Sequence, residues 1–272
     1  MSSITITATS GLRVIPSAVL DVRRPHRMLE RSLMVTRRNW MVVFSGFFEP
    51  LFYLLSIRIG MSELVGDVTF GGKPIGYAEF VAPALMAASA MNGAVYDSTM
   101  NVFFKLKYAR LYDAVLATPM SPADVALGEI GWAVTRGTLY AMAFLGTMAA
   151  LGMTGSIWSI AAVPFCVLIA FAFASVGMAV TTYMRSWVDF EYVTASTVPL
   201  FLFSATFYPL SSYGDWGWVV QLSPLYHGVA LVRAANTGTL DATAFAHVAV
   251  LIALSVVGLF VAARRVRELL LK

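Results

Sequence analysis

The chain has 272 residues, of which 58% are hydrophobic and only 12% are charged, and its formal net charge is +4 at pH 7. Soluble domains contain about 25% charged residues, so this composition excludes an ordinary soluble protein and indicates an integral membrane protein. The basic residues form no single patch, and the positive-inside rule explains their distribution better than nucleic-acid binding does. We therefore expect no nucleic-acid partner.

The two ends of the chain are predicted to stay in the cytoplasm. Residues 1–22 contain no long apolar core behind a basic start, so we expect a cytoplasmic tail there and no cleavable signal peptide. Residues 23–39 mix arginines with methionines and leucines, which predicts an amphipathic connecting helix on the anionic cytoplasmic leaflet. Residues 264–272 are basic and are expected to form a short cytoplasmic tail.

Six stretches are long and apolar enough to cross roughly 30 Å of hydrocarbon as helices. The predicted spans are Trp40–Ile59, Glu79–Phe104, Val125–Leu151, Trp158–Met184, Tyr192–Leu210 and Phe245–Ala263. With six spans and both ends inside, most lysines and arginines lie in the cytoplasm, and only Arg58, Lys73 and Arg233 lie outside. The sequence thus predicts an all-α protein of the bacterial plasma membrane, with a transmembrane domain over residues 40–263.

A charged, proline-broken segment separates the second and third predicted spans at residues 105–118. A helix there would place Tyr108, Leu111, Tyr112 and Val115 on one face, at the spacing of an amphipathic surface. Such a face could dock on a partner protein, and an ordinary polar loop is the alternative.

The third span has its own start signal. Thr118–Pro119 ends the preceding helix, because the residue before a proline is pushed out of the α region. Ser121 followed by Pro122 and Asp124 then predicts an N-cap with proline at the first helical position.

The last external segment, residues 209–243, is long and carries Trp216 and Trp218 as interfacial anchors. A short helix that carries His227 and Arg233 is predicted within it. A helical hairpin that dips into the outer leaflet fits this pattern, and a plain external loop is the alternative.

Four ionisable residues lie within the predicted spans: Glu49, Asp97, Glu129 and Arg136. Charged groups at membrane depth are costly and usually face the interior of the bundle, often at functional positions. Glu129 and Arg136 are seven residues apart, so they lie on one face of a helix and can share a partner helix. A role in substrate handling and a role in holding helices together are both open.

The chain contains no recognisable catalytic or nucleotide-binding motif. Its three histidines lack metal-ligand spacing, and no phosphate-binding loop or nucleophile elbow occurs. The single cysteine, Cys166, excludes an intrachain disulfide. We therefore expect no metal site and no enzyme, and energy for transport must come from an ion gradient or another subunit.

Two long stretches resemble the membrane subunits of type-2 ABC exporters. PLFLFSATFYPLSSYGDWGWVVQLSPLYHGVALVRA, from Pro199 to Ala234, resembles the closing motif of that family. FFKLKYARLYDAVLATPMSPADVALGEIGWAVTRGTLYA resembles its branch of nodulation-type lipo-oligosaccharide exporters and daunorubicin-resistance-type drug permeases. EPLFYLL at Glu49 and APALMAASAMNGAVYDSTM in the second span extend the resemblance over the chain after about Arg24.

The resemblance implies a subunit that binds no ATP itself. Two separate ATP-binding subunits would hold ATP and Mg, and a second, identical membrane subunit would complete the exporter among the membrane lipids. The amphipathic segment would be a coupling helix that receives the ATP-driven movement. Its contact residues would be Tyr108, Leu111, Tyr112, Asp113, Val115 and Leu116.

The resemblance also implies a role for the first and fifth spans. In the family these spans form the dimer interface and the lateral path for amphiphilic substrates, which here involves helices around Glu49 and Phe203. One departure is Ser204–Ala205, where the family usually has Ser-Gly. The extra methyl group of Ala205 is expected to alter packing at the fifth span.

We therefore expect the permease subunit of an ATP-driven exporter, which moves a lipid-linked saccharide, lipid or hydrophobic drug outward by alternating access. One alternative is a proton-coupled secondary transporter that uses Glu49, Asp97 and Glu129, although six spans without a visible repeat and the coupling segment argue against it. A membrane-embedded lipid enzyme is a further alternative, which the lack of a nucleophile or metal constellation disfavours.

Overall fold

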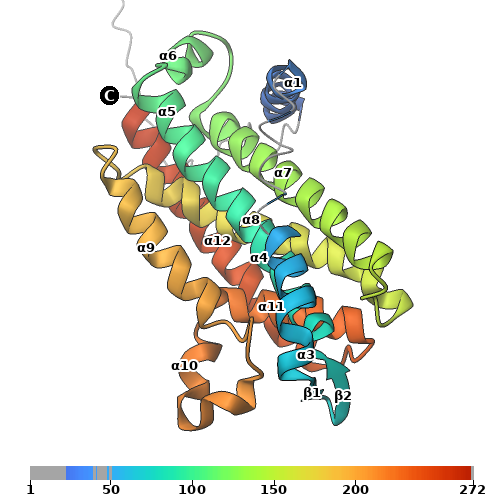
Figure 1. Cartoon of the computed structure of the whole chain (residues 1–272). Coiled ribbons are helices and arrows are strands. Elements are labelled where there is room, and N and C mark those ends of the chain that lie inside the picture. Colours follow the sequence, from blue (N-terminus) through green and yellow to red (C-terminus); the bar gives the residue numbers. More distant parts are fainter. Residues whose placement is uncertain (1–22, 39–40, 42–47, 49–50, 271–272) are drawn as a thin grey trace, which may run out of the picture.

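A computed structural model of the chain describes residues 23–38, 41, 48 and 51–270. The elements, in chain order, are α1 (Arg23–Arg38), η2 (Ile57–Met61), α3 (Ser62–Val65), β1 (Asp67–Phe70), β2 (Lys73–Gly76), α4 (Tyr77–Tyr96), η3 (Asp97–Asn101), α5 (Val102–Lys107), α6 (Leu111–Leu116), α7 (Pro122–Ala150), η4 (Ile157–Ala161), α8 (Ala162–Thr181), α9 (Asp189–Leu202), η5 (Leu210–Trp216), α10 (Gly217–Gln221), α11 (Pro224–Thr237) and α12 (Thr243–Leu270). They form an elongated helical bundle. The C-terminal end of α12 and α6 lie at one end, and the β1–β2 hairpin and α10 lie at the other (Figure 1).

Three helical stretches among the described residues are long and apolar enough to cross a membrane: Tyr77–Lys107, Ile157–Thr181 and Thr243–Leu270. They coincide with the second, fourth and sixth predicted spans, which confirms a helical membrane protein. The last of them continues to Leu270, so the predicted tail that follows Ala263 begins as helix. Nine of the 20 residues of the first predicted span, Trp40–Ile59, lie outside the described residues, as does the whole predicted tail of residues 1–22.

The third predicted span forms a long helix, whereas the fifth forms a helix shorter than the sequence predicted. The third corresponds to α7, whose 29 residues make it about 44 Å long at a rise of about 1.5 Å per residue. Ser121 caps α7 by accepting a hydrogen bond from the backbone of Asp124, whose side chain accepts from the backbone of Ser121, so the predicted N-cap is confirmed. The fifth predicted span, which was expected to reach Leu210, corresponds to the 14-residue α9 and ends at Leu202.

A small β-hairpin interrupts the helical fold between α3 and α4. Strands β1 and β2 pair antiparallel, with Val68 opposite Ile75. Gly71 and Gly72 both have positive φ angles, which is the backbone that a two-residue hairpin turn requires. The described chain is therefore not purely helical, in contrast to the all-α fold that the sequence predicted.

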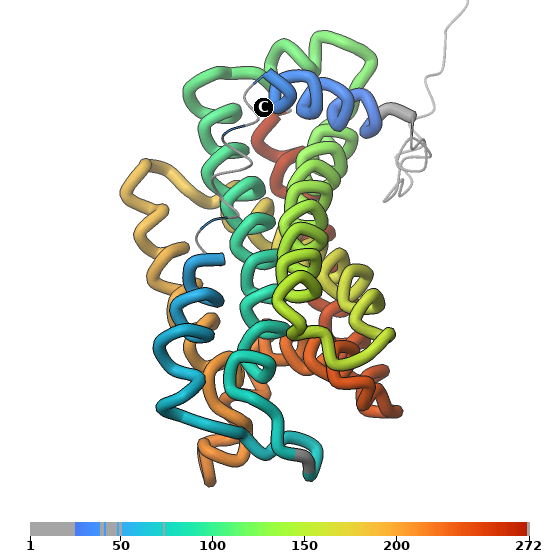
Figure 2. The backbone as a smooth tube through the Cα atoms, turned by 45° about the vertical axis from the view of Figure 1, so that its right-hand side comes forward, coloured from blue at the N-terminus to red at the C-terminus, as the bar shows by residue number. Residues whose placement is uncertain are grey.

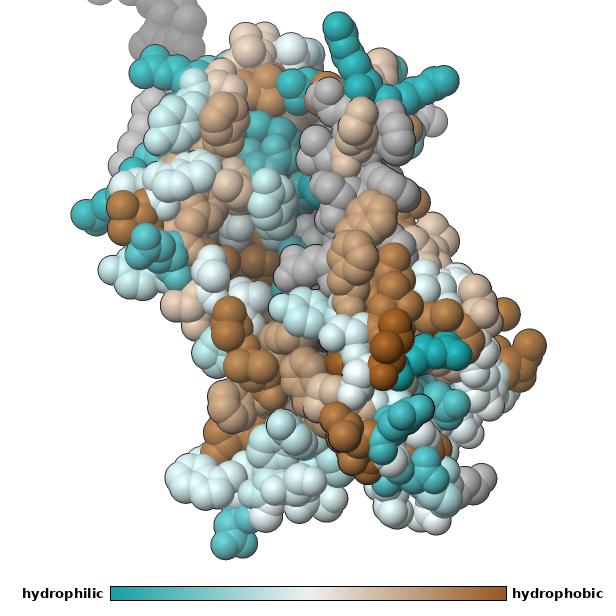
Figure 3. Space-filling model, in the orientation of Figure 1, coloured by the Kyte–Doolittle hydropathy of each residue, from teal (hydrophilic) through white to brown (hydrophobic). Residues whose placement is uncertain are grey.

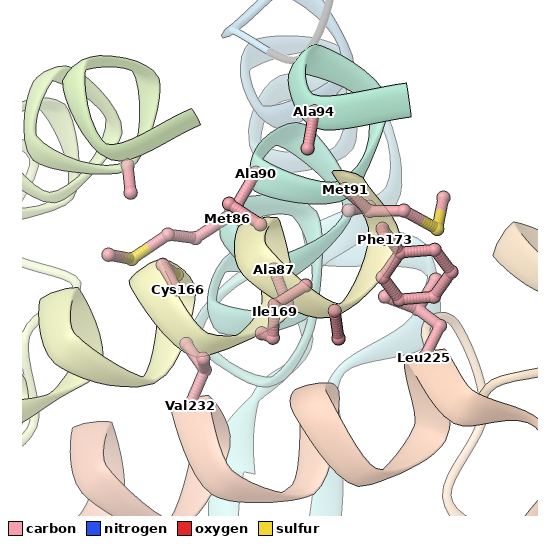
Figure 4. Close-up of a cluster of buried hydrophobic side chains, with 14 of the residues drawn as sticks. Met86, Ala87, Ala90, Met91, Ala94, Cys166, Ile169, Phe173, Leu225 and Val232 are labelled. Atoms are coloured by element: carbon pink, nitrogen blue, oxygen red, sulfur yellow. The ribbon is translucent and has the colours of Figure 1, made fainter. Parts of the chain in front are cut away.

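The core lies where α4, α8 and α11 meet, and α4 is buried over most of its length. Figure 4 shows Met86 and Met91 of α4 beside Ile169 and Phe173 of α8, with Leu225 of α11 closing the cluster. Small residues permit this close packing, which is common between membrane helices.

Gly137 of α7 is one of the close contacts that only a glycine permits. A Cβ atom there would lie 2.9 Å from the side chain of Ala170 and 3.1 Å from the carbonyl oxygen of Ala90. The helices α4, α7 and α8 are therefore held together at a point where no larger side chain fits.

The outer surface is apolar along much of its length. Figure 3 shows hydrophobic side chains over the middle of the visible face and hydrophilic ones gathered mostly toward the ends. Exposed large hydrophobic residues include Val198, Phe245, Val256, Val257 and Phe260. An apolar surface of this extent suits contact with lipid rather than water.

Candidate functional site

A cavity of about 370 Å³ lies where α1, the continuous helix from α4 to α5, and α7 meet. Figure 2 shows α1 lying across the end of α7. The cavity is lined by Arg31, Ser32, Val35, Thr36, Tyr96, Asp97, Met100, Asn101, Phe104, Lys105, Trp132, Arg136 and Trp187. The cavity combines aromatic walls with both signs of charge, which is unusual inside an apolar bundle.

The backbone at this cavity departs from a regular α-helix. Residues 97–101 form η3, one turn of π-helix between α4 and α5. Such π-helical turns occur mostly as single bulges in α-helices and frequently mark functional sites. Here the bulge includes Asp97 and Asn101, which both line the cavity.

Asp97 and Arg136 form an ion pair across the helices, with 2.8 Å between Arg136 Nη1 and Asp97 Oδ1. Arg136 Nε also donates to the hydroxyl of Tyr140 at 2.8 Å, and its guanidinium lies over the rings of Tyr96 and Tyr140. Both charged residues are buried. The other carboxylate oxygen of Asp97, Oδ2, is buried and has no hydrogen-bond partner within the described part of the chain.

Glu129 and Lys105 form a second buried ion pair, with 2.7 Å between Lys105 Nζ and Glu129 Oε2. Glu129 and Arg136 thus both reach the continuous helical stretch Tyr77–Lys107, which carries Asp97 and Lys105. Glu129 and Arg136 are seven residues apart on α7, which is about two helical turns, so both side chains face this neighbouring helix. Glu49, the remaining predicted intramembrane acid, lies outside the described residues.

The cavity brings two ion pairs and several aromatic rings together. The carboxylates are engaged by cations. Among the residues that the structure describes, no cluster of three or more histidine, cysteine, aspartate or glutamate side chains could hold a metal ion. Open hydrogen-bonding groups beside aromatic rings are the usual composition of a recognition site.

The predicted coupling segment is two helices around a turn, not one helix over residues 105–118. The first ends at Lys107, and Arg110 adopts a left-handed conformation with φ of 44° before α6 begins. Tyr108 is consequently outside α6 and 61% exposed, whereas Tyr112 is only 2% exposed. The single amphipathic face expected from the sequence is therefore split.

The remaining predicted coupling residues are either exposed to solvent or half-buried against the bundle. Asp113 is exposed, and Leu111, Val115 and Leu116 are half-buried. Any surface that this segment offers to a partner consists mainly of Tyr108, Asp113 and the neighbouring turn. Tyr112 instead contacts the bundle of its own chain.

Arg233, which the sequence placed in the external loop, is buried in α11. Its guanidinium lies 3.8 Å from the centre of the Phe80 ring. It donates to the carbonyl oxygens of Phe80 at 3.1 Å and of Ala205 at 2.8 Å. The segment Ser204–Thr206 after α9 is buried, and Arg233 supplies its backbone with the donors that a helix would have supplied.

Other predicted residues of the external hairpin are placed differently. Trp216 and Trp218 are 71% and 63% exposed, as interfacial anchors would be. His227 of α11 and His247 of α12 form a hydrogen bond with 2.7 Å between their Nδ1 atoms, a contact that sequence reasoning missed because the two are twenty residues apart. Phe203, at the end of α9, is exposed.

The helix α9 (Asp189–Leu202) contacts the bundle through Phe190, whose ring centre lies 5.2 Å from that of Phe103, and through Leu200 and Phe201. None of the side chains in Asp189–Leu202 is buried within the described chain. A helix that is apolar in composition and has no buried residue exposes much of its surface to lipid or to another protein.

Comparison with known proteins places these features in one family. The sequence profile of the family described as ABC-2 type transporter matches residues 26–236. The chain is 30% identical over 226 residues to nodulation protein J of Rhizobium leguminosarum bv. trifolii, which covers 82% of this chain and 85% of that protein. It is 26% identical over 249 residues to nodulation protein J of Rhizobium meliloti (strain 1021), covering 88% and 94% of the two chains.

Proposed function

Since the chain belongs to the ABC-2 type transporter family, we propose that it is the permease subunit of an ATP-driven exporter that moves an amphiphile out of the bacterial cytoplasm or inner leaflet. The single observation that carries the export site is the charged, aromatic cavity between α1, η3 and α7. No ATP site is expected in this chain, so ATP and Mg would be bound by a partner subunit.

The proposed cargo has a polar headgroup and an apolar tail, as a lipid-linked saccharide does. Asp97 Oδ2 offers a buried acceptor, and Asn101 and Arg31 line the same cavity as polar groups. The rings of Tyr96 and Trp132 provide flat apolar walls against which a sugar or another ring can pack. A headgroup in this cavity would be shielded from hydrocarbon, while the tail stays among the apolar helix surfaces.

We propose six spans with both termini in the cytoplasm. The basic residues of α1, α5 and the end of α12 gather at one end of the bundle, where the positive-inside rule places the cytoplasm (Figure 1). The β-hairpin and the α10–α11 segment then lie on the outer side, with α10 and α11 as the helical hairpin.

The partners follow from the same orientation. Two ATP-binding subunits would dock at the cytoplasmic end on the exposed side of the α5–α6 turn, around Tyr108 and Asp113. A second, identical permease would cover α9, whose uncovered surface supports this arrangement. Alternating access would follow when ATP draws the two docking sites together.

The test is gentle purification of the complex from its native membrane, followed by mass spectrometry. The proposal predicts a stoichiometric ATP-binding subunit, and transport of a fluorescent glycolipid in reconstituted vesicles that requires ATP and survives collapse of the proton gradient. Transport by the purified chain alone that persists without ATP and stops when the proton gradient is dissipated would overturn it in favour of a proton-coupled transporter.

A further inference from the structure

A groove of about 530 Å³ lies between α8 and α9, apart from the charged cavity. Its lining includes Thr99 of η3, whereas Asp97 and Asn101 of the same turn line the charged cavity. The two spaces therefore lie on different faces of one helical turn. The wall of this second space, the α8–α9 groove, is mostly apolar.

Two facing stripes of side chains form the groove. The lining residues of α9 fall at positions i, i+3, i+4, i+7, i+8 and i+11 from Asp189 to Leu200, and those of α8 fall at i, i+3, i+4 and i+7 from Phe173 to Val180. This spacing places each set on one side of its helix. From Asp189 to Leu200 the groove runs for about 16 Å, at a rise of about 1.5 Å per residue. The hydrocarbon of one leaflet is about 15 Å deep, half of the bilayer core, so the groove matches the depth of one leaflet.

Exposed aromatic side chains surround one end of the groove. Tyr183 and Tyr192 line it, and Trp187 lies in the turn between the two helices. Tyrosine and tryptophan gather at the level of the lipid headgroups, where one part of the side chain is wet and the other is apolar. This end therefore lies at the headgroups, and the end near Leu200 and Leu254 lies in the hydrocarbon.

The headgroup end of the groove also carries cations. Arg185 lines the groove, and its guanidinium forms no hydrogen bond or ion pair with any residue in the part of the chain that the structure describes. The carboxylate of Asp189 accepts hydrogen bonds from the backbone nitrogens of Arg185 and Ser186, at 2.6 and 3.0 Å. The guanidinium of Arg265, from α12, lies over the ring of Tyr183, 4.3 Å from its centre. An anion at this end would meet the N–H donors of Arg185 close to a second arginine.

We propose that the α8–α9 groove binds one membrane phospholipid, with an acyl chain between the two helices and an anionic headgroup at Arg185. The length of the groove fits one leaflet, and its wall suits a hydrocarbon chain. The planar guanidinium of Arg185 matches the geometry of a phosphate. The lipid would fill the space that α8 and α9 leave between their facing sides.

The dimensions of the groove favour a hydrocarbon chain over a protein segment. A volume of about 530 Å³ over about 16 Å gives a mean cross-section of about 33 Å², whereas a helix about 10 Å wide occupies about 80 Å². A second copy of the chain can therefore cover the outward side of α9 but does not fit into this groove.

The groove is also separate from the path expected for the exported cargo. The first and fifth predicted spans meet where the rings of Tyr53 and Phe201 lie 6.4 Å apart, and neither residue lines the α8–α9 groove. The phospholipid site thus goes beyond the proposed export function and does not depend on the identity of the cargo.

The experiment is native mass spectrometry of the purified full-length protein, titrated with phosphatidylglycerol or with phosphatidylcholine. We expect one lipid site per chain that binds the anionic phosphatidylglycerol more tightly. Ser196→Trp places an indole in the groove and should weaken the binding of both lipids several-fold. Ala195→Trp is the matched control, because Ala195 is also exposed on α9 but does not line the groove, and it should leave both affinities unchanged.

A second pair of variants tests the headgroup end. Arg185→Gln should lower the affinity for phosphatidylglycerol about fivefold and leave that for phosphatidylcholine unchanged. Arg110→Gln, at an exposed position outside the groove, should change neither. Arg185 is exposed, so this pair decides the question even if Ser196→Trp does not fold.

Three results would overturn the proposal. They are unchanged lipid binding in a folded Ser196→Trp protein, an equal loss in Ala195→Trp, and equal effects of Arg185→Gln and Arg110→Gln. Loss of a second copy of the chain from Ser196→Trp, with lipid binding intact, would assign the groove to a protein interface instead.

Discussion

Ala205 adopts a backbone conformation that is unfavourable for any residue with a Cβ atom. Its φ angle is 54°, in the left-handed region, and its backbone lies in the buried segment after α9. A Cβ atom makes this conformation unfavourable, whereas glycine adopts it freely. The exporters that this chain resembles usually have glycine at this position. The left-handed backbone explains that preference, whereas the sequence had suggested an effect on helix packing.

Ala205→Gly is therefore expected to stabilise the protein, by about 1 kcal/mol at most. The measurement is the thermal unfolding midpoint of the purified protein in detergent. Ala230→Gly, within the helix α11, is the control and should lower the midpoint, because glycine weakens a helix interior. A fall of the midpoint in both variants would show that the left-handed backbone at Ala205 carries no strain.

The buried ion pair between Asp97 and Arg136 leads to a second prediction about a single residue. Asp97→Asn removes one negative charge from a buried guanidinium and should destabilise the protein by about 3 kcal/mol. Asp113→Asn, at an exposed position on α6, should change stability by less than about 0.5 kcal/mol. Similar unfolding midpoints for both variants would contradict a structural contribution from the Asp97 carboxylate.

At the scale of single elements, the sequence predicted features that depend on neighbouring residues better than features that depend on contacts between distant residues. Ser121 and Asp124 specify the start of α7 through bonds between near neighbours, so the N-cap could be read from the chain. The end of α9 depends on Arg233, which is 28 residues from the Ala205 carbonyl that it binds. The partner of Arg136 is 39 residues away, and nothing in the local sequence marks the π-helical turn that contains it.

The helices α1 and α7 approach each other most closely at Gly128. A Cβ atom on Gly128 would lie 2.4 Å from Cβ of Met28, so these two helices touch where α7 has no side chain. This contact holds α1 over the cavity, to which α1 contributes Arg31. A larger residue at Gly128 forces the two helices apart.

Gly128→Ala is accordingly expected to cost about 1–3 kcal/mol and to make α1 more accessible to protease. Gly146→Ala is the matched control in the same helix, since a Cβ atom there meets nothing within 4 Å. It should leave α1 protected and stabilise α7 by up to about 1 kcal/mol. Equal protease sensitivity in the two variants would mean that α1 is not held at Gly128.

At the scale of the whole molecule, the two ends of the bundle are chemically different. The basic helix α1, the basic end of α5 and the basic end of α12 lie at the end that bears α6 (Figure 1). The exposed Trp216 and Trp218 belong to η5 and α10 at the other end. Composition and charge predicted this asymmetry and the membrane class. They could not predict the β-hairpin or the exposure of α9, which depend on how separate segments meet.

The proposed orientation can be tested with cysteines in intact cells. Ser212→Cys, on the α10 side, should react with a membrane-impermeant maleimide added outside. Thr118→Cys, next to α6, should react only after the cells are permeabilised; both positions are exposed. The native Cys166 is buried and serves as the unreactive background. The reverse labelling pattern would place α6 outside and refute the orientation.

The hydrogen bonds of Arg233 also impose an order on biogenesis. The carbonyl groups of Ala205 and Thr206 are synthesised before the arginine that satisfies them, while the third acceptor, on Phe80, is made 153 residues earlier than Arg233. Unpaired carbonyls are costly in hydrocarbon, so the segment after α9 cannot settle at depth while the nascent chain is still short of α11. Insertion of the C-terminal third is thereby tied to an N-terminal helix that is already in place.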